Sequence, residues 1–330
     1  MYESRIADLE ADLASRDNQF RELMDSSVIV EIPEEEEKKY EGPVSYVSHR
    51  EVRKPGSSST PMRMVINSSL KFHGVSPNDI WIKGPNALND MFGILLRLRT
   101  HKIALISDIK KMYTRICTTL REKHMRRLLW RFGDTSKPFK TYGINRVMFG
   151  DKPAAAISAV AIRETAEIYK SINEEAAAKI KDDTYVDDIT TGGDTMKEID
   201  SLKEGISEIL AKGGMEVKGF VISGDDSEEA LSLLGSGEIS RVLGVGYYPG
   251  PDEFSVSATI NISKKYRGAR TGTDYSYEDI PKLITIVLTR RIIQGIVYSC
   301  YDIYGLVTPI RNRPQISTTT SEDLARVWTG

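Results

Sequence analysis

Cysteine and histidine are scarce in this sequence of 330 residues, which contains two of the first and four of the second. Two cysteines, Cys117 and Cys300, exclude a disulfide framework, and the scattered histidines do not have the spacing of a Cys/His zinc site. No apolar run approaches the ~20 residues that span a bilayer. The acidic N-terminus also lacks the apolar core of a signal peptide. These absences predict an intracellular protein with no membrane partner.

The composition is that of an ordinary globular protein, with 40% hydrophobic and 28% charged residues. The length suggests about two domains, or one larger unit with several lobes. The formal charge of −2 is unevenly distributed, because residues 1–40 hold twelve acidic and five basic residues, a net charge of −7. The remaining residues therefore carry +5, which permits nucleic-acid binding without identifying it.

Two adjacent carboxylates, Asp187 and Asp188, stand between the β-branched residues Val186 and Ile189. Since β-branched residues favour strands and aspartate does not, the pattern predicts a β-hairpin with both carboxylates at its tip. Their repulsion of roughly 1 kcal/mol or more is normally offset by a cation, and a divalent metal is the strongest candidate. Taken alone, the pair is weak evidence for a metal site, because most such pairs are solvated turn residues.

A third carboxylate, Asp108, ends the apolar run of residues 103–107. If this run forms a strand beside the hairpin of residues 183–190, Asp108 and Asp187 converge on one cluster that Asp188 completes. Such a cluster suits Mg²⁺, which Mn²⁺ can replace, and two ions about 3.5–4 Å apart drive in-line phosphoryl transfer in polymerases and nucleases. The pattern therefore indicates a site for Mg²⁺ at Asp108 and Asp187, with Asp188 as a further and less certain ligand.

Several short motifs occur in an order that is more specific than any one of them. They are Met62–Asn67, Ile94–Arg99, Ser107–Tyr113, Leu129–Arg131 and Tyr185–Gly192. The ordered set resembles the reverse transcriptase segment of BEL/Pao-type LTR retrotransposons, from about residue 20 almost to the C-terminus. The resemblance implies an RNA-directed DNA polymerase that binds an RNA or DNA template with a primer and a deoxynucleoside triphosphate (dNTP).

The implied fold is α+β, a right-hand polymerase with fingers and a palm whose antiparallel sheet is backed by helices, and a partial thumb. The expected division is an acidic N-terminal helix and linker in residues 1–40, fingers and palm in residues 41–260, and a partial thumb or connection in residues 261–330. The linker is the acidic run at residues 34–37, which we expect to be solvated. Residues 1–25 predict an amphipathic helix, docked on the body or, alternatively, dimerising or disordered.

The resemblance also implies roles for single residues. Tyr113 matches the aromatic gate that excludes a 2′-hydroxyl, although a tyrosine in this position is commonly a core residue. Lys218 matches a lysine proposed to protonate the leaving pyrophosphate, although an exposed lysine is commonly just solvated. Arg63 lies in the expected hairpin of residues 44–53 and 62–67, at the position that contacts the triphosphate, and its planar fork suits phosphate.

Two further segments are implied to contact nucleic acid. Gly244, Gly246 and Tyr247 match the primer grip, where glycines let the backbone approach the primer, although glycines in strands also mark bulges. Phe149 and Gly150 match a segment that binds the nucleotide and template. This segment departs from the family pattern, because Asp151 and Lys152 are inserted before an early proline, and its contacts are therefore in doubt.

Other expected elements follow from propensity and turn signals. They are helices over residues 85–100, 154–178, 196–212 and 281–301, and strands over residues 127–133, 139–149, 215–223, 241–248 and 254–258. No triplet of an aspartic protease, acidic cluster of a ribonuclease H or phosphate-binding loop is present, which predicts a polymerase module alone. The alternatives are a catalytically inactive or co-opted fragment that binds nucleic acid or protein and, less well matched, a two-metal nuclease. The sequence does not indicate an oligomeric state.

Overall fold

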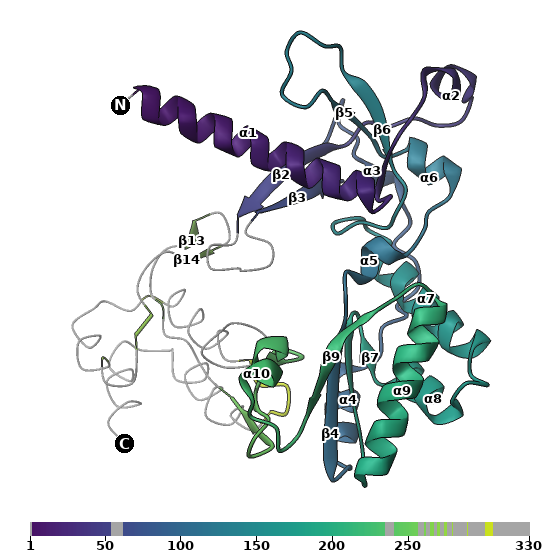
Figure 1. Cartoon of the computed structure of the whole chain (residues 1–330), viewed down its shortest axis with the longest axis vertical. Coiled ribbons are helices and arrows are strands. Elements are labelled where there is room, and N and C mark those ends of the chain that lie inside the picture. Colours follow the sequence, from purple (N-terminus) through teal and green to yellow (C-terminus); the bar gives the residue numbers. More distant parts are fainter. Residues whose placement is uncertain are drawn as a thin grey trace.

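The computed structural model describes residues 2–53, 62–234 and 241–256, with residues 261, 265–266, 269–270, 274–275, 279, 289 and 301–305. Each pair of strands in these residues is antiparallel, so the expectation of an α+β protein with antiparallel sheets is confirmed (Figure 1). The turn expected at residues 54–60, the helix expected at 281–301 and most of the expected thumb lie outside the described residues.

A four-stranded sheet is at the centre of one half of the described chain, in the order β7-β8-β4-β9. Its strands are β4 (Ile103–Ile109), β7 (Thr184–Tyr185), β8 (Asp188–Gly193) and β9 (Val217–Ile222). Two further sheets have three strands each: β1 (Ile29–Glu31), β6 (Lys140–Ile144) and β5 (Arg127–Trp130) in one, and β10 (Arg241–Val242), β11 (Val245–Tyr248) and β12 (Glu253–Ser255) in the other. Two more are two-stranded hairpins. They are β2 (Ser48–Arg53) with β3 (Met62–Asn67), and β13 (Lys265–Tyr266) with β14 (Ala269–Arg270).

Both faces of the four-stranded sheet are covered. On one face, Leu105 and Ile109 pack against helices α7 (Ala154–Ile168), α8 (Glu174–Asp182) and α9 (Met196–Lys212). On the other, Ala104 and Ile106 pack against α4 (Met91–Leu98), α10 (Glu228–Leu234) and the β10–β11 hairpin. The apolar run of β4 is continuous because successive side chains of a strand enter opposite faces, and both are buried.

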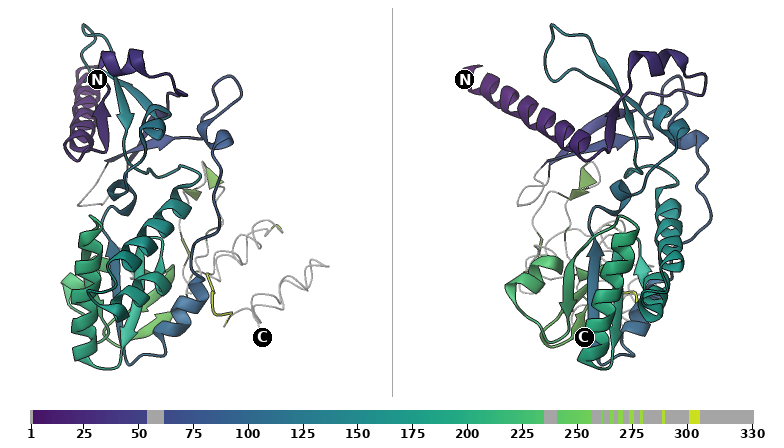
Figure 2. Two further views of the ribbon diagram at one scale, coloured as in Figure 1. Left: turned by 90° about the vertical axis from the view of Figure 1, so that its right-hand side faces the viewer. Right: turned by 45° about the vertical axis from the view of Figure 1, so that its right-hand side comes forward.

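The N-terminal helix α1 (Tyr2–Asp25) begins away from the other described elements and ends against the sheet of β1, β6 and β5 (Figures 1 and 2). Phe20 is fully buried and stacks on Trp130 with 4.5 Å between ring centroids. Asp17 accepts a hydrogen bond of 3.0 Å from the indole N–H of Trp130. Aromatic stacking and a satisfied indole donor hold α1 in place, so the expectation of a docked helix is confirmed.

The prediction that the acidic run after α1 is a solvated linker is only partly correct, because Glu34 and Glu35 are exposed, whereas Glu36 and Glu37 pair with basic residues. The run forms helix α2 (Glu34–Lys39), in which Glu36 accepts from the side chains of Lys123 and His124 at 2.6 and 2.9 Å. Glu37 accepts from Arg127 at 2.9 Å. These basic residues, almost ninety positions along the chain, hold the second half of the acidic run against the protein.

The prediction of a single helix over residues 154–178 is wrong, because α7 ends at Ile168 and α8 begins at Glu174. Asn173 accepts a hydrogen bond from the backbone N–H of Ala176, and such N-capping starts a new helix. Helix α9 matches the expectation for residues 196–212, whereas most strands and α4 are shorter than expected. Besides α2, four short helices among the described residues do not correspond to any predicted helix: α3 (Pro77–Ile80), α5 (Met112–Arg115), α6 (Leu120–His124) and α10.

Candidate active site

Asp108 and Asp188 lie directly opposite each other on the neighbouring antiparallel strands β4 and β8. Directly opposed residues project from the same face of a sheet, with Cβ atoms about 4.5–5.5 Å apart. Two like charges in this position destabilise a strand pair unless another group offsets them. The sheet therefore concentrates negative charge at the end of β4, as the sequence predicts.

Asp187 lies beside this pair, in the turn between β7 and β8. Tyr185 pairs with Asp188, so only Val186 and Asp187 form the turn. Val186 has a φ of +57°, and a positive φ at the first of two central residues is the pattern of a type II′ turn, which normally has glycine there. The backbone N–H of Ile109 donates to the carbonyl of Asp187 at 2.8 Å, which ties the turn to β4.

The carboxyls of this cluster have perturbed protonation. Burial, followed by the charges of Asp187 and Asp108, raises the pKa of Asp188 to about 7. Burial and the charge of Asp108 also raise the pKa of Asp187, and the Lys218 ammonium opposes both shifts. Carboxyls with pKa values raised by burial and by each other are typical of functional sites.

Lys218 is the cation of this site. Its Nζ lies 3.0 Å from Oδ1 of Asp108, and it comes from β9, on the other side of β4. The pairing of β4 with β9 shifts register between Ser107 and Ile109, so β9 has an extra residue opposite Asp108. Such a bulge redirects side chains, and this one accompanies the approach of the lysine to the carboxylates.

The three carboxylates fit a hard divalent cation. Among the described residues, no three histidine, cysteine, aspartate or glutamate side chains meet closely enough to form a ready-made metal site. Mg²⁺ does not need one, because it keeps several waters and binds through one or two carboxylates together with substrate phosphates. A carboxylate cluster whose negative charge is only partly offset by one lysine has the donors and the charge for such an ion.

Tyr113 lies on α5, just beyond β4, with its ring edge-to-face with that of Phe149 at 4.6 Å between centroids. Burial and the charge of Asp187 raise the pKa of its hydroxyl, which also contacts the buried Ser158. Phe149 is 52% exposed. The structure thus brings Tyr113 and Phe149 together near the carboxylates and leaves an aromatic surface accessible.

Gly150 and the inserted Asp151 are held by a buried polar group that the sequence did not reveal. Asp151 accepts from Arg126 and from Ser68, at 2.6 Å in both cases, and both charged side chains are almost fully buried. The carbonyl of Gly150 accepts from the side chain of Asn78 at 2.9 Å. The insertion that put this segment in doubt therefore fastens it to the loop that follows β3.

The remaining predicted residues lie in two hairpins. Arg63 is in β3 opposite Val52, and its side chain lies outside the described residues. Gly244 follows Leu243 in a two-residue turn in which both have a positive φ, the pattern of a type I′ hairpin.

The other two predicted residues of the primer grip, Gly246 and Tyr247, are both in β11. Tyr247 is fully buried and donates its hydroxyl to Asp252 at 2.8 Å. Its side chain belongs to the core, so the backbone is the part of this residue that remains to approach a primer.

In the part of the chain that the structure describes, no helix combines the length and apolar character needed to cross a membrane. A comparison with protein-family models finds no matching family, and a comparison with curated protein sequences finds no match.

Solved structures do resemble the chain. It is similar to the foamy viral protease-reverse transcriptase in complex with double-stranded DNA, at 15% identity and a TM-score of 0.51, over 92% of this chain and 44% of that one. It also matches the prototype foamy virus protease-reverse transcriptase, at 19% identity and a TM-score of 0.43, over 60% of this chain and 22% of that one. The chain thus spans less than half of either protein. At these identities the first likeness establishes the fold alone, which is reverse-transcriptase-like.

Proposed function

We propose that this chain is the core of an RNA-directed DNA polymerase, which transfers a nucleotide from a dNTP to the 3′-hydroxyl of a primer. The observation that carries the proposal is the pairing of Asp108 with Asp188 next to the turn that contains Asp187. Partly buried carboxylates, two of them with raised pKa values and one paired with a lysine, support a cation-binding site of the kind that nucleotidyl transfer needs. The reverse-transcriptase-like fold supports the same class of reaction.

Asp108, Asp187 and Asp188 would hold two Mg²⁺ ions, or Mn²⁺ in their place, and these ions would lower the pKa of the primer hydroxyl and neutralise the leaving pyrophosphate. Lys218 would provide the proton that the pyrophosphate takes up, since its ammonium already lies among the carboxylates. The protein's main contribution is positioning, because phosphoryl transfer needs little covalent chemistry from side chains.

Aromatic and backbone groups would position the substrates. Tyr113 would stack under the sugar of the incoming nucleotide and exclude a 2′-hydroxyl, with Phe149 packed against it. Arg63 would bind the triphosphate. The backbone at Gly244 and Gly246 would approach the primer, and the double-stranded DNA bound by the foamy viral structure supports a duplex as the ligand.

In this proposal the four-stranded sheet is the palm, the hairpin β2–β3 belongs to the fingers, and a partial thumb follows residue 260. The ordered motifs support descent from a BEL/Pao-type retrotransposon, and the scarcity of cysteine supports an intracellular location.

Primer extension tests the proposal directly. The assay uses an RNA template with a DNA primer, dNTPs and Mg²⁺ or Mn²⁺. We expect metal-dependent extension by the wild-type chain. The exchange Asp187→Asn should lower the rate by about 1000-fold or more, because the loss of a metal-binding charge removes several kcal/mol of transition-state stabilisation.

A matched control is Asp200→Asn, which makes the same chemical change on the exposed face of α9 and should leave the rate unchanged. Asp200 is 3.6 Å from Lys203 on the same helix, and exposed pairs of this kind contribute little. Folded protein that binds template-primer but extends no primer would contradict the polymerase and favour the alternative, a non-catalytic nucleic-acid-binding module. Extension that Asp187→Asn leaves intact would contradict the assignment of the site.

A further inference from the structure

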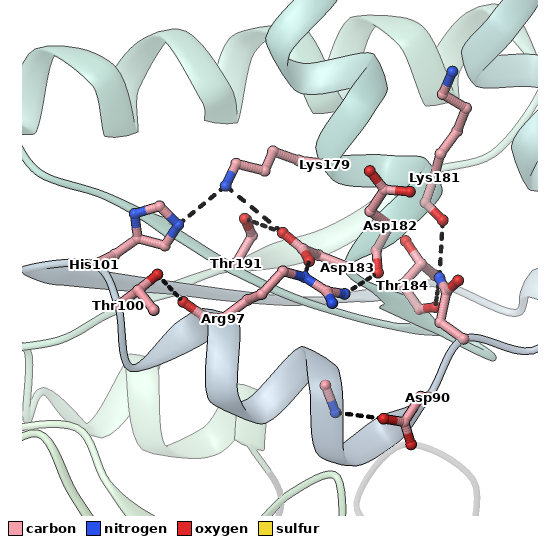
Figure 3. Close-up of polar contacts among 12 residues, drawn as sticks. Asp90, Arg97, Thr100, His101, Lys179, Lys181, Asp182, Asp183, Thr184 and Thr191 are labelled. Atoms are coloured by element: carbon pink, nitrogen blue, oxygen red, sulfur yellow. Dashed lines mark hydrogen bonds and ion pairs between the residues drawn. The ribbon is translucent and has the colours of Figure 1, made fainter.

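A fully buried carboxylate, Asp183, lies at the opposite end of the β7–β8 hairpin from the carboxylate cluster. It is 2% exposed, and each of its oxygens has a partner (Figure 3). Oδ1 accepts from Nε of Arg97 at 2.7 Å, and Oδ2 accepts from the hydroxyl of Thr191 at 2.8 Å. Nζ of Lys179 lies 3.8 Å from Oδ2. This carboxylate is compensated by cations on two helices and tied to a strand.

The backbone around Asp183 is held by the same elements. Its carbonyl accepts from the N–H of Thr190 at 2.9 Å. Nη2 of Arg97 donates to the carbonyl of Asp182 at 2.5 Å (Figure 3). The amide of Asn89 donates to the carbonyls of Lys181 and Thr184, at 2.8 Å each. The end of α8 and the start of β7 are therefore fixed by α4 and the segment before it, far from the turn in sequence.

The turn that carries Asp187 needs such support. Strand β7 has only two residues, so the hairpin has few ladder hydrogen bonds of its own. Its first turn residue, Val186, is β-branched and has a φ of +57°, a conformation that persists only where the surroundings enforce it. The contacts of Asp183 act on both strands at once, because they join the residue before β7 to Thr190 and Thr191 in β8.

We propose that Asp183 and Arg97 form a positioning pair, which fixes the β7–β8 hairpin and thereby sets where Asp187 and Asp188 are held. Neither residue touches the carboxylate cluster, so they act through the backbone of the hairpin. The effect on the hairpin is independent of any activity, whereas its consequence for metal binding and catalysis rests on the proposed function. The sequence offers no signal for the pair, because its members are separated by 86 positions.

Amide hydrogen exchange tests the proposal without an activity assay. The variants are Asp183→Asn, which removes the charge and keeps the shape, and Arg97→Lys, which keeps the charge and removes the planar fork. We expect amides of residues 185–189 to exchange about tenfold faster or more in both variants, while those of β9 stay unchanged, because local opening is separate from global unfolding. Asp182→Asn is the matched control, since it changes the adjacent, exposed side chain and leaves the backbone contact to Arg97 intact.

Binding of Mn²⁺, followed by its paramagnetic resonance signal, is the second measurement. Groups that orient metal-binding residues typically change metal affinity by about 10–100-fold, and we expect a loss in this range for Asp183→Asn. In primer extension the same variant should lower kcat and leave KM for the dNTP nearly unchanged. If Asp183→Asn does not fold, Thr191→Val, which removes only one hydroxyl, should give smaller shifts in the same direction.

Unchanged exchange at residues 185–189 in folded variants, or faster exchange spread evenly over all four strands, would overturn the proposal and leave a pair that only stabilises the fold. A loosened hairpin with unchanged Mn²⁺ affinity would overturn its link to the site. If the wild-type chain neither binds Mn²⁺ nor extends a primer, the proposed function fails, and the exchange data still decide whether Asp183 and Arg97 hold the hairpin.

Discussion

The two ends of the β7–β8 hairpin carry carboxylates in opposite surroundings, a fully buried one at one end and partly buried ones at the other. At one end, Asp183 is paired with Arg97 and Thr191, close to Lys179. At the other, the pKa of Asp188 rises to about 7 because burial and two neighbouring carboxylates outweigh Lys218. A buried charge with matched partners fixes structure, whereas surplus charge of one sign provides a site for an ion of the other sign. The two ends differ in burial as well as in partners, since Asp183 is fully buried and the carboxylates at the turn are only partly so.

The largest effect is expected where a matched pair is broken. Arg126→Met leaves Asp151 buried without its cation, and we expect the free energy of unfolding to fall by about 3–5 kcal/mol, measured by denaturant unfolding. Burial already raises the pKa of Asp151, and this variant should raise it further. An acid whose pKa is higher in the folded than in the unfolded state favours folding at low pH, so the loss should be smaller at pH 5 than at pH 8.

The double exchange Arg126→Met with Asp151→Leu provides the control, since it removes both charges and should recover much of the loss. If the single variant loses less than about 1 kcal/mol at pH 8, Arg126 does not stabilise the buried charge of Asp151.

A smaller effect is expected for Asp17, which accepts from the neutral indole of Trp130. Trp130→Phe keeps an aromatic ring to stack on Phe20 and removes the donor, so it should lower the free energy of unfolding by about 1–3 kcal/mol. Asp17→Asn retains an acceptor for the indole and should cost less. The same unfolding assay measures both variants. If they lose equal free energy of unfolding, the hydrogen bond from Trp130 to Asp17 is not what stabilises the contact.

The smallest effect, with the opposite sign, is expected at Asp188. The folded-state pKa of about 7 lies above the ordinary 3.8, so this carboxyl is neutral in the folded protein at pH 5 and is ionised at a cost by pH 8. Without divalent ions, Asp188→Asn should therefore stabilise the protein at pH 8 by about 1 kcal/mol after solvent screening, or about 2 °C in Tm, and have little effect at pH 5. Thermal unfolding in a chelator measures this, and a lower Tm at pH 8 would contradict it.

The sequence predicted the part of the site that depends on local pattern. An apolar run that ends in Asp108 and a hairpin centred on Asp187 are signals within a few residues, and the structure places both as expected. The register was not predicted, because the structure pairs Asp108 with Asp188, whereas the prediction brought Asp108 together with Asp187, which lies in the turn.

The sequence did not predict features that depend on distant partners. The acidic run at Glu36 reads as solvated until Lys123 and His124 are placed beside it. The break between α7 and α8 depends on one capping side chain, that of Asn173, in a segment otherwise favourable to helix. Asp183 and Asp151 look like surface acids in the sequence, and their burial follows only from arginines elsewhere in the chain.

The ion pair between Lys218 and Asp108 has a consequence for the order in which the protein assembles. Small metal-dependent domains stay unfolded until their ion arrives, because only the ion offsets the charge of their ligands. Here a side chain of the protein is an internal counter-ion from the moment the strands pair. The four-stranded sheet is therefore expected to form in a chelator, so that folding and the supply of divalent ions are independent events.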